Sequence, residues 1–476
     1  MDMSKSAKLV ENIKSVMLVV LLLFTILLLY FFWGSSPFKT LTEGDRPQAQ
    51  AVSAIDMIQP DHIDVCLGGD AYTVTENKFG VIMDCFKEFS ASKTLSIEEI
   101  SKSGYDEVMK LPSIRAVFDY YVPFSAICDI YGIDKIPGAD AVSAVSELGY
   151  AAGYDDSLFI SDKRSGKYFR IAGSAGGAFT VLKDEIEAAK NGGFTYFTVG
   201  TYVGGEVKNN ALCPVSFESD AHDIPYSPED FSAHQEKLNE IIKGFFSGNF
   251  DFVRRIEEEG GTVIYMYGYG KTVVIARSDG TLEFKGEDDE KAATQLKYLE
   301  AFDKAGAFIA AHGAFDTLDG AKCAPYLKEV VTDPDGKKGF RFIFGMKING
   351  RNVYYQDGAP VIVDVTNGKV TYFKRSLIDV GQATAVKSGS REVYSAINLL
   401  AVNNEYIRNA LAEAGVTDAA GITFDEIAAM TSRFDSGYVR ADKDKGELKA
   451  AWIVMIGGLE FYFGLDDGTP IGYYGQ

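Results

Sequence analysis

Histidine and tryptophan are both scarce in this sequence. Its 476 residues include four His and two Trp, and no two histidines stand four positions apart beside a Glu, as a zinc-protease helix requires. His222 and His234 are separated by a stretch that offers no cysteine ligand. The sequence therefore predicts no metal site, and no motif in it indicates an organic cofactor.

Cysteine is also rare, and its pattern argues against a disulfide scaffold. No two of the five cysteines form a CxxC pair, and their number is odd. A single bridge between Cys66 and Cys85 stays open from spacing alone. The alternative is that the thiols are small buried hydrophobic side chains. The cysteines are Cys66, Cys85, Cys128, Cys213 and Cys323.

Positive charge is in deficit, because 47 Lys and Arg face 67 Asp and Glu, a net charge of −20. Nucleic-acid binding needs clustered basic residues on a surface, so the composition excludes nucleic acid as a partner. It also argues against flat adhesion to anionic lipid. The acidic excess is typical of a surface that stays soluble by charge.

Motifs for catalysis are missing as well. The segment Tyr265–Thr272 contains Gly-Lys-Thr but has Tyr265 where a phosphate-binding loop needs Gly, so a hairpin turn is favoured. Ser174 lacks the flanking glycine pattern of a nucleophile elbow. Carboxylates are too common here to single out a catalytic pair. The sequence predicts no catalytic residue and a protein that is not an enzyme.

A long apolar run is present near the N-terminus. Val16–Trp33 contains no charge, Gly or Pro, and ends in Tyr30 and three further aromatic residues. Eighteen helical residues span roughly 27 Å, close to the thickness of a bilayer core. Lysines precede the run, so the positive-inside rule places residues 1–15 in the cytoplasm. The run exceeds the 7–15 residues of a signal peptide, which favours an uncleaved anchor.

The remainder predicts a multidomain α+β ectodomain outside the cell membrane. Residues 34–59 have the prolines and weak periodicity of a tether. The composition then predicts an N-terminal α+β part over 60–225, a helix-plus-meander module over 226–312, and a C-terminal module pair over 313–476.

Local patterns predict individual elements of the N-terminal part. A hairpin is expected where Ser157–Ile160 and Tyr168–Ile171 flank a Gly-containing turn. We expect helices over Ile97–Met109 and Ala141–Leu148, and a strand over Phe194–Val203.

Helix-and-meander patterns recur from residue 227 onward. Ser227 and Pro228 carry the signals that open a helix, and further helices are expected over 287–311, 391–402, 405–414 and 424–430. Strand–turn–strand patterns follow at three places, which predicts repeated modules that each pack helices on one antiparallel sheet. The patterns span 262–285, 339–375 and 448–474.

The anchor and the C-terminal third resemble the YycH/YycI regulators of Gram-positive bacteria, with PepSY-like repeats. The resemblance rests on Glu11–Ser15 leading into the apolar run, on Gly339–Phe344 with Ile348–Tyr354, and on the ending from Leu448. It implies a non-enzymatic, single-pass regulator of a WalK-type sensor histidine kinase. The implied partners are that kinase and a sister single-pass regulator, and self-association stays open.

If the resemblance holds, the anchor contacts the transmembrane helices of the kinase. Thr25, Tyr30 and Trp33 are the candidate contact residues, and Thr25 is the polar side chain within the aliphatic run. A hydrogen bond from Thr25 to its own helix is the alternative. This hypothesis also predicts an ectodomain without a deep polar catalytic cleft.

Two other classes of function remain open. One is an envelope-binding module for peptide, glycan or unfolded protein, in which an exposed sheet edge accepts a peptide strand. The other is a cell-wall hydrolase that uses carboxylates, for which no residue pair stands out.

Overall fold

A computed structural model describes Met17 and residues 52–475, apart from 76–77, 92–94, 135, 175–176, 194, 205–206, 247, 288–294, 321–322, 357, 382–388, 417–420 and 442–445. The expected anchor Val16–Trp33 lies outside the described residues except for Met17, as does most of the tether. Within the described part of the chain, we find no helix with both the length and the apolar character needed to cross a membrane.

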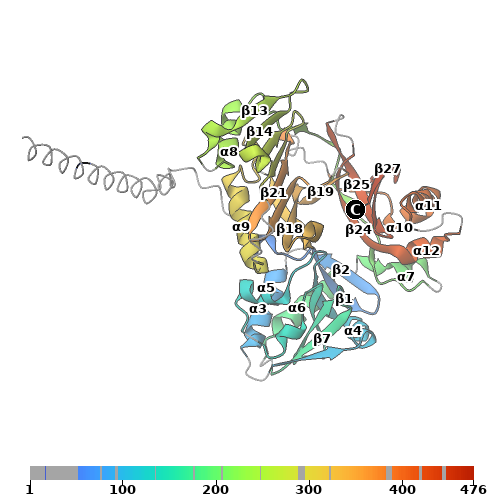
Figure 1. The fold of residues 1–476 in the computed structure, drawn as a ribbon. Helices are drawn as coiled ribbons and strands as arrows, with labels where there is room; N and C mark the ends of the chain where they lie inside the picture. Colours follow the sequence, from blue (N-terminus) through green and yellow to red (C-terminus); the bar gives the residue numbers. More distant parts are fainter. Residues whose placement is uncertain are drawn as a thin grey trace, which may run out of the picture. The chain divides into compact units, whose positions relative to one another are not determined.

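A nine-stranded antiparallel sheet organises the first half of the described chain (Figure 1). Its strand order is β3-β7-β6-β5-β4-β1-β2-β8-β9, so the first strand of the chain lies near the middle of the sheet. Helices α3 and α6 bury apolar side chains such as Phe86 and Leu182 in the core of this sheet. The strands are β1 (His62–Gly68), β2 (Ala71–Thr75), β3 (Ser96–Ile100), β4 (Ser113–Val117), β5 (Glu147–Ala151), β6 (Ser157–Asp162), β7 (Lys167–Ala172), β8 (Tyr196–Thr198) and β9 (Leu212–Pro214). The helices are α3 (Phe79–Ser90), α4 (Lys102–Met109), α5 (Phe124–Tyr131), α6 (Thr180–Gly192) and α7 (Val199–Val203).

A second, larger sheet contains most of the remaining strands, in the order β13-β14-β15-β16-β21-β20-β18-β19-β24-β25-β26-β27. Its pairings are antiparallel except for β19 with β24, and β17 adds to β18 outside this order. The strands are β13 (Arg254–Glu257), β14 (Val263–Tyr267), β15 (Thr272–Ala276), β16 (Thr281–Lys285), β17 (Ala324–Thr332), β18 (Gly339–Ile348), β19 (Arg351–Tyr355), β20 (Val361–Thr366), β21 (Lys369–Ser376), β24 (Thr431–Arg440), β25 (Glu447–Ile456), β26 (Leu459–Gly464) and β27 (Pro470–Gly475).

Five helices accompany the larger sheet. Phe302 of α9 packs edge-on against Phe342 of β18, with ring centroids 5.4 Å apart. Helices α10, α11 and α12 bury Leu399, Leu411 and Ile427 in the same core. The helices are α8 (Gln235–Gly244), α9 (Tyr298–Ala311), α10 (Ala396–Val402), α11 (Asn404–Glu413) and α12 (Phe424–Met430).

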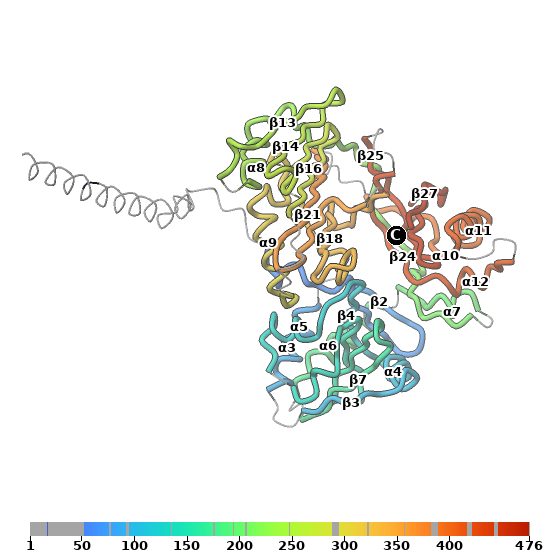
Figure 2. The backbone as a smooth tube through the Cα atoms, in the orientation of Figure 1, coloured from blue at the N-terminus to red at the C-terminus, as the bar shows by residue number. Residues whose placement is uncertain are grey.

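The predicted hairpins and meanders are confirmed. β6 and β7 pair across a turn in which Gly166 has a φ of +70°. The Gly268–Gly270 segment forms the turn between β14 and β15, so no phosphate loop exists there. The three strand–turn–strand patterns are also present, but β16 pairs with β21 and β19 with β24, so they join into one continuous sheet. The backbone path in Figure 2 shows this continuity from β16 through β21 to β18.

One helix prediction in the N-terminal half is wrong in part, and another is wrong. Ser96–Ile100 is strand β3, with Ile97 opposite Ile171 of β7, and the helix α4 begins only at Lys102. Ser101 sets that boundary because its hydroxyl caps the helix by accepting from the Gly104 N–H. The segment 141–148 is not a helix, because it ends in strand β5, which pairs with β4.

The expected strand over Phe194–Val203 is also divided. It is a strand only from Tyr196 to Thr198 and then turns into helix α7, capped by the Thr198 hydroxyl accepting from the Thr201 N–H. Gly200 allows this turn, since a Cβ there would lie 2.6 Å from the Val207 carbonyl oxygen.

Helix starts after residue 226 also differ from the prediction. Ser227–Pro228 forms a short strand, β12, with Ile378–Asp379, and helix α8 begins at Gln235. Of the helix expected over 287–311, residues 288–294 lie outside the described residues, Glu287 and 295–297 are not helical, and α9 begins at Tyr298. The helix expected from 391 begins at Ala396. In the first case a tertiary strand pairing overrides a local capping signal.

The end of the expected tether packs on the globular part. Ala54–Met57 forms helix α2, and Ile58 after it is fully buried. Gly306 of α9 permits the approach, because a Cβ at this position would lie 3.0 Å from the carbonyl oxygen of Val52.

Candidate functional site: a polar cavity beside two sheets

A cavity of about 1160 Å³ lies where the middle of the nine-stranded sheet meets β17, β19 and β24 of the larger sheet. Of these strands, β1, β19 and β24 are labelled in Figure 1. Side chains from the face of β1 and β4 line one wall. The cavity lining is polar, which distinguishes it from the apolar pockets that bind most small hydrophobic ligands.

Arg115 organises the first ion cluster of this wall. It stands on β4 directly opposite Asp64 on β1, and its Nη2 lies 2.9 Å from Asp64 Oδ2. Its Nη1 lies 3.8 Å from Glu147 Oε2, and Lys163 Nζ lies 2.8 Å from Glu147 Oε1. The Tyr105 hydroxyl donates to Glu147 at 2.7 Å. Burial opposes the charge on Glu147, yet Arg115 and Lys163 outweigh it and lower the pKa of this carboxyl.

His62 connects this cluster to a second one. Its Nδ1 lies 3.0 Å from Asp61 Oδ2, and its Nε2 lies 3.3 Å from Asp64 Oδ1. Burial opposes protonation of the ring, but Asp64 and Asp61 outweigh burial and raise the pKa of His62 to about 10. Burial would raise the pKa of Asp64, but Arg115 and His62 lower it to about 2. His62 is therefore an imidazolium held between two carboxylates at neutral pH.

Arg433 joins the two sheets. It stands on β24, yet its Nη1 lies 2.6 Å from Asp119 Oδ2 and its Nη2 lies 3.2 Å from Asp61 Oδ2, both in the N-terminal half. Asp435 on its own strand accepts from Nη2 at 2.9 Å, and Tyr354 donates to the same carboxylate. Burial opposes ionisation of Asp61, but Arg433 lowers its pKa to about 2. One guanidinium thus ties strand β24 to one end of the antiparallel β1–β4 pair, where Asp61 precedes β1 and Asp119 follows β4.

The charges that line the cavity nearly balance. Seven carboxylates and seven Lys or Arg side chains line it, and protonated His62 adds one positive charge. In a chain of net charge −20, this is a local departure from the acidic average. Exposed Lys208 lies on the lining and forms no ion pair among the described residues. The interior can hold polar groups of both signs.

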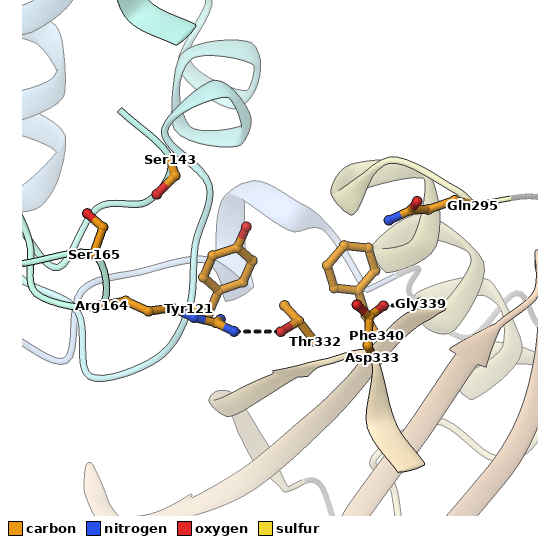
Figure 3. A pocket seen from close by; sticks show the side chains of 9 residues that line it. All are labelled: Tyr121, Ser143, Arg164, Ser165, Gln295, Thr332, Asp333, Gly339 and Phe340. Carbon is orange, nitrogen blue, oxygen red and sulfur yellow. Dashed lines mark hydrogen bonds between the residues drawn. The ribbon is translucent and has the colours of Figure 1, made fainter. Parts of the chain in front are cut away.

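A smaller cavity of about 410 Å³ lies beside the β6–β7 turn (Figure 3). Arg164 of that turn donates from Nη2 to the Thr332 hydroxyl at 2.7 Å and lies over the Tyr121 ring, 4.8 Å from its centroid. Figure 3 shows Arg164 reaching from the turn toward the end of β17. The arrangement ties the nine-stranded sheet to the end of β17.

The sequence-predicted contact residues Thr25, Tyr30 and Trp33 lie outside the described residues. His222 and His234 do not come together as a pair: His222 Nδ1 lies 3.3 Å from the Asp220 carbonyl oxygen, and His234 Nε2 lies 2.5 Å from Asp319 Oδ1. No group of three or more potential ligands is placed to hold a metal within the part that the structure describes.

Sequence reasoning missed the charged cavity. The sequence contains one indication of a polar wall: His62 and Asp64 alternate with apolar residues on strand β1, so their side chains share one face of the sheet. The partners on that face come from positions 115, 147 and 433, which the sequence does not connect. Only the fold brings these groups to one wall.

Comparisons with known proteins relate the chain to one solved structure by fold. No protein-family model matches the sequence, and no curated protein matches it. The crystal structure of YycH from Bacillus subtilis matches with a TM-score of 0.56 and 10% sequence identity, covering 90% of this chain and 99% of that one. The chain has the fold of YycH, which confirms at the level of the fold the resemblance seen in the sequence. The α+β class is confirmed with it.

Proposed function

We propose that this chain is a non-enzymatic, membrane-anchored regulator of a two-component sensor histidine kinase, and a member of the YycH/YycI group. The observation that carries the proposal is the YycH fold, which extends over 90% of the chain. The apolar run Val16–Trp33 supports it, since such a regulator needs an anchor beside the kinase helices.

In this proposal the N-terminus is cytoplasmic and residues 34–476 lie outside the cell membrane. The parts 60–225, 226–312 and 313–476 are its proposed ectodomain units, and the described helix-and-sheet packing supports an α+β ectodomain. Protease added to intact cells should degrade the ectodomain and spare the first fifteen residues. Protection of the ectodomain until the cells are lysed would contradict this orientation.

Regulation would act through contact with two states of the kinase. A regulator shifts such an equilibrium only by binding one state more tightly than the other. Thr25, Tyr30 and Trp33 are proposed to lie at the contact between helices, with a sister regulator as an additional partner. Self-association is an alternative use of the same helix.

Crosslinking in native membranes tests the kinase contact. A photoreactive residue is placed at Thr25 in the full-length chain, and a matched chain carries the same residues of Val16–Trp33 in scrambled order. Recovery of a sensor kinase with the first chain and its loss with the scrambled chain would support the proposal. Recovery of wall material or secreted proteins alone, unchanged by scrambling, would refute it.

The polar cavity favours a second candidate function, an extracytoplasmic binding module on the same anchor. A cavity of about 1160 Å³ with both signs of charge can accommodate a polar ligand. A binding module predicts ligand retention by a chain whose anchor sequence is scrambled. Loss of binding on scrambling would exclude it.

A further inference from the structure

Two kinds of wall enclose the polar cavity. Residues from β1 and β4 line it at alternate positions, as His62 and Asp64 do, which is the pattern of a strand seen face-on. In contrast, Thr431–Ser436 and Lys208–Leu212 line it as unbroken runs. Successive side chains of a strand point to opposite faces of the sheet, so consecutive residues line the same cavity only where the edge of the strand faces it. The cavity therefore has a charged face on one side and strand edges on another.

The edge of β24 is open along the cavity. On one side β24 pairs with β25 over its length, but on the other side its pairing with β19 begins only at Tyr438. No strand of the described chain pairs with that side between Thr431 and Gly437. The open stretch Ser432–Ser436 measures roughly 16 Å at the usual rise of about 3.3 Å per residue.

Side chains show which backbone groups face outward there. The Ser436 N–H is turned away from β25 and donates to the Asp435 carboxylate at 2.7 Å. Because backbone groups alternate in direction along an antiparallel strand, Phe434 presents its N–H and C=O to the same side. On the side of β24 away from β25, neither the N–H nor the C=O of Phe434 forms a hydrogen bond within the described structure. The Asn352 Oδ1 atom, buried in the same lining, also has no partner within the described structure.

The charged groups of the wall do not need a ligand, because they are already paired. Arg115, His62 and Arg433 each lie within 3.3 Å of at least one carboxylate oxygen. Among the described residues of the lining, the groups without a hydrogen-bond partner include the Phe434 N–H and C=O and two side-chain oxygens, Asn352 Oδ1 and Asp64 Oδ1. A main chain in extended conformation is the ligand that supplies donors and acceptors at the matching spacing. Two exposed lysines on the lining, Lys102 and Lys208, favour an acidic side chain on that ligand.

We propose that the cavity binds an extended peptide segment of another protein, which adds to the open edge of β24 at Ser432–Ser436 and carries an acidic residue toward Lys208. The proposal deepens the second candidate function, since it names the ligand class of the binding module. It does not depend on contact with a kinase, so the two proposals can fail separately.

The test uses the full-length chain, immobilised in detergent micelles, and two pools of synthetic hexapeptides. Both pools are acetylated and amidated, have glutamate at the third position and are randomised elsewhere. The second pool is N-methylated at alternate positions, which removes the donors needed for strand pairing. We expect the first pool to be retained at least tenfold more than the second. Equal retention of the two pools, or retention of neither, would overturn the proposal.

Two further measurements locate the contact. Hydrogen exchange of the segment 431–436 should slow at least fivefold when the retained peptides are added, with Phe434 most affected. Slowing confined to other segments would overturn the assignment to β24. Lys208→Glu should reduce retention of the glutamate pool about fivefold, while the matched surface variant Lys338→Glu, outside the cavity, should leave it unchanged. Equal effects of the two variants would remove Lys208 from the site and overturn its part in the proposal.

Discussion

Arg375 and Glu229 form the most deeply buried ion pair of the described structure, each side chain being 1% exposed. Arg375 Nη1 lies 2.5 Å from Glu229 Oε2, and Nη2 donates to the Asp316 carbonyl oxygen. The Leu318 N–H donates to the same Glu229 carboxylate. This network explains why Glu229 does not begin a helix, as its sequence neighbours predict, but turns inward to strand β21.

Removal of one member of this pair should be strongly destabilising. We expect Arg375→Met to lower the free energy of unfolding by about 3–5 kcal/mol, because an unpaired carboxylate stays buried. The double variant Arg375→Met, Glu229→Leu should recover a large part of the loss. Urea unfolding of the full chain in micelles measures both.

A surface pair provides the control. Arg391 and Asp466 form a bidentate pair in which Asp466 is 62% exposed. Arg391→Met should change the free energy of unfolding by at most about 1 kcal/mol. A loss as large as that of Arg375→Met would show that burial does not decide the effect.

His62 should keep its proton well above neutral pH. Its folded pKa of about 10 exceeds the value of 6.5 for an unperturbed imidazole. Its charge therefore contributes stability that is complete below pH 6.5 and is lost as the pH rises through 10. Asp61 and Asp64 have pKa values of about 2, so their contributions are present above pH 4 and are lost as the pH falls toward 2.

Histidine-selective NMR of the full chain measures this titration. One imidazole signal, absent in His62→Gln, should titrate near pH 10. A midpoint near 6.5 for that signal would contradict the ion arrangement around His62.

At the scale of elements, close approaches of backbone decide how α2 and α9 pack. Gly306 on α9 accommodates the carbonyl group of Val52, and the neighbouring residue Ala307 is exposed. Gly306→Val should displace the segment 52–58 and increase its cleavage by thermolysin severalfold, since an added side chain cannot fit. Ala307→Val, which adds the same side chain one position further on, should leave the cleavage rate unchanged. Similar rates for both variants would show that segment 52–58 does not depend on this contact.

Strand pairing overrides local propensity in several of these elements. Ile97 and Ile100 are three residues apart, as on one face of a helix, yet cross-strand contacts with β7 place them in β3. The three meanders have the predicted turns. Tight hairpin turns need residues at positive φ, and the sequence places Asn and Gly there, as at Asn367 and Gly368. How the meanders join edge to edge depends on contacts between residues about a hundred positions apart, such as Phe284 with Phe373.

At the scale of the whole molecule, the five cysteines add no covalent link. All five are unpaired, including Cys66 and Cys85, for which a bridge was left open. Burial raises the pKa of Cys85 to about 11 and that of Cys213 to about 12, so these thiols are poor nucleophiles at neutral pH.

A reducing agent should therefore leave the stability unchanged. We expect the thermal midpoint of the full chain to agree within about 1 °C with and without dithiothreitol, since no disulfide constrains the unfolded state. Thiol titration should find five free thiols after unfolding. A drop of several degrees on reduction, or three titratable thiols, would indicate a bridge.

The sequence by itself determined the features that depend on short-range patterns: the apolar run, the β6–β7 hairpin, the turns of the three meanders, the helix at Phe424–Met430 and the α+β class. Each results from residues within about twenty positions of one another. The charged cavity could not be read in this way. His62, Arg115 and Arg433 lie on strands β1, β4 and β24, which are far apart in the sequence. They come together only through the order of strands within the sheets and the packing of those sheets. Strand order and sheet packing are set by the burial of apolar faces over the whole chain, so only the tertiary structure decided where these charges, and the open edge of β24, would lie.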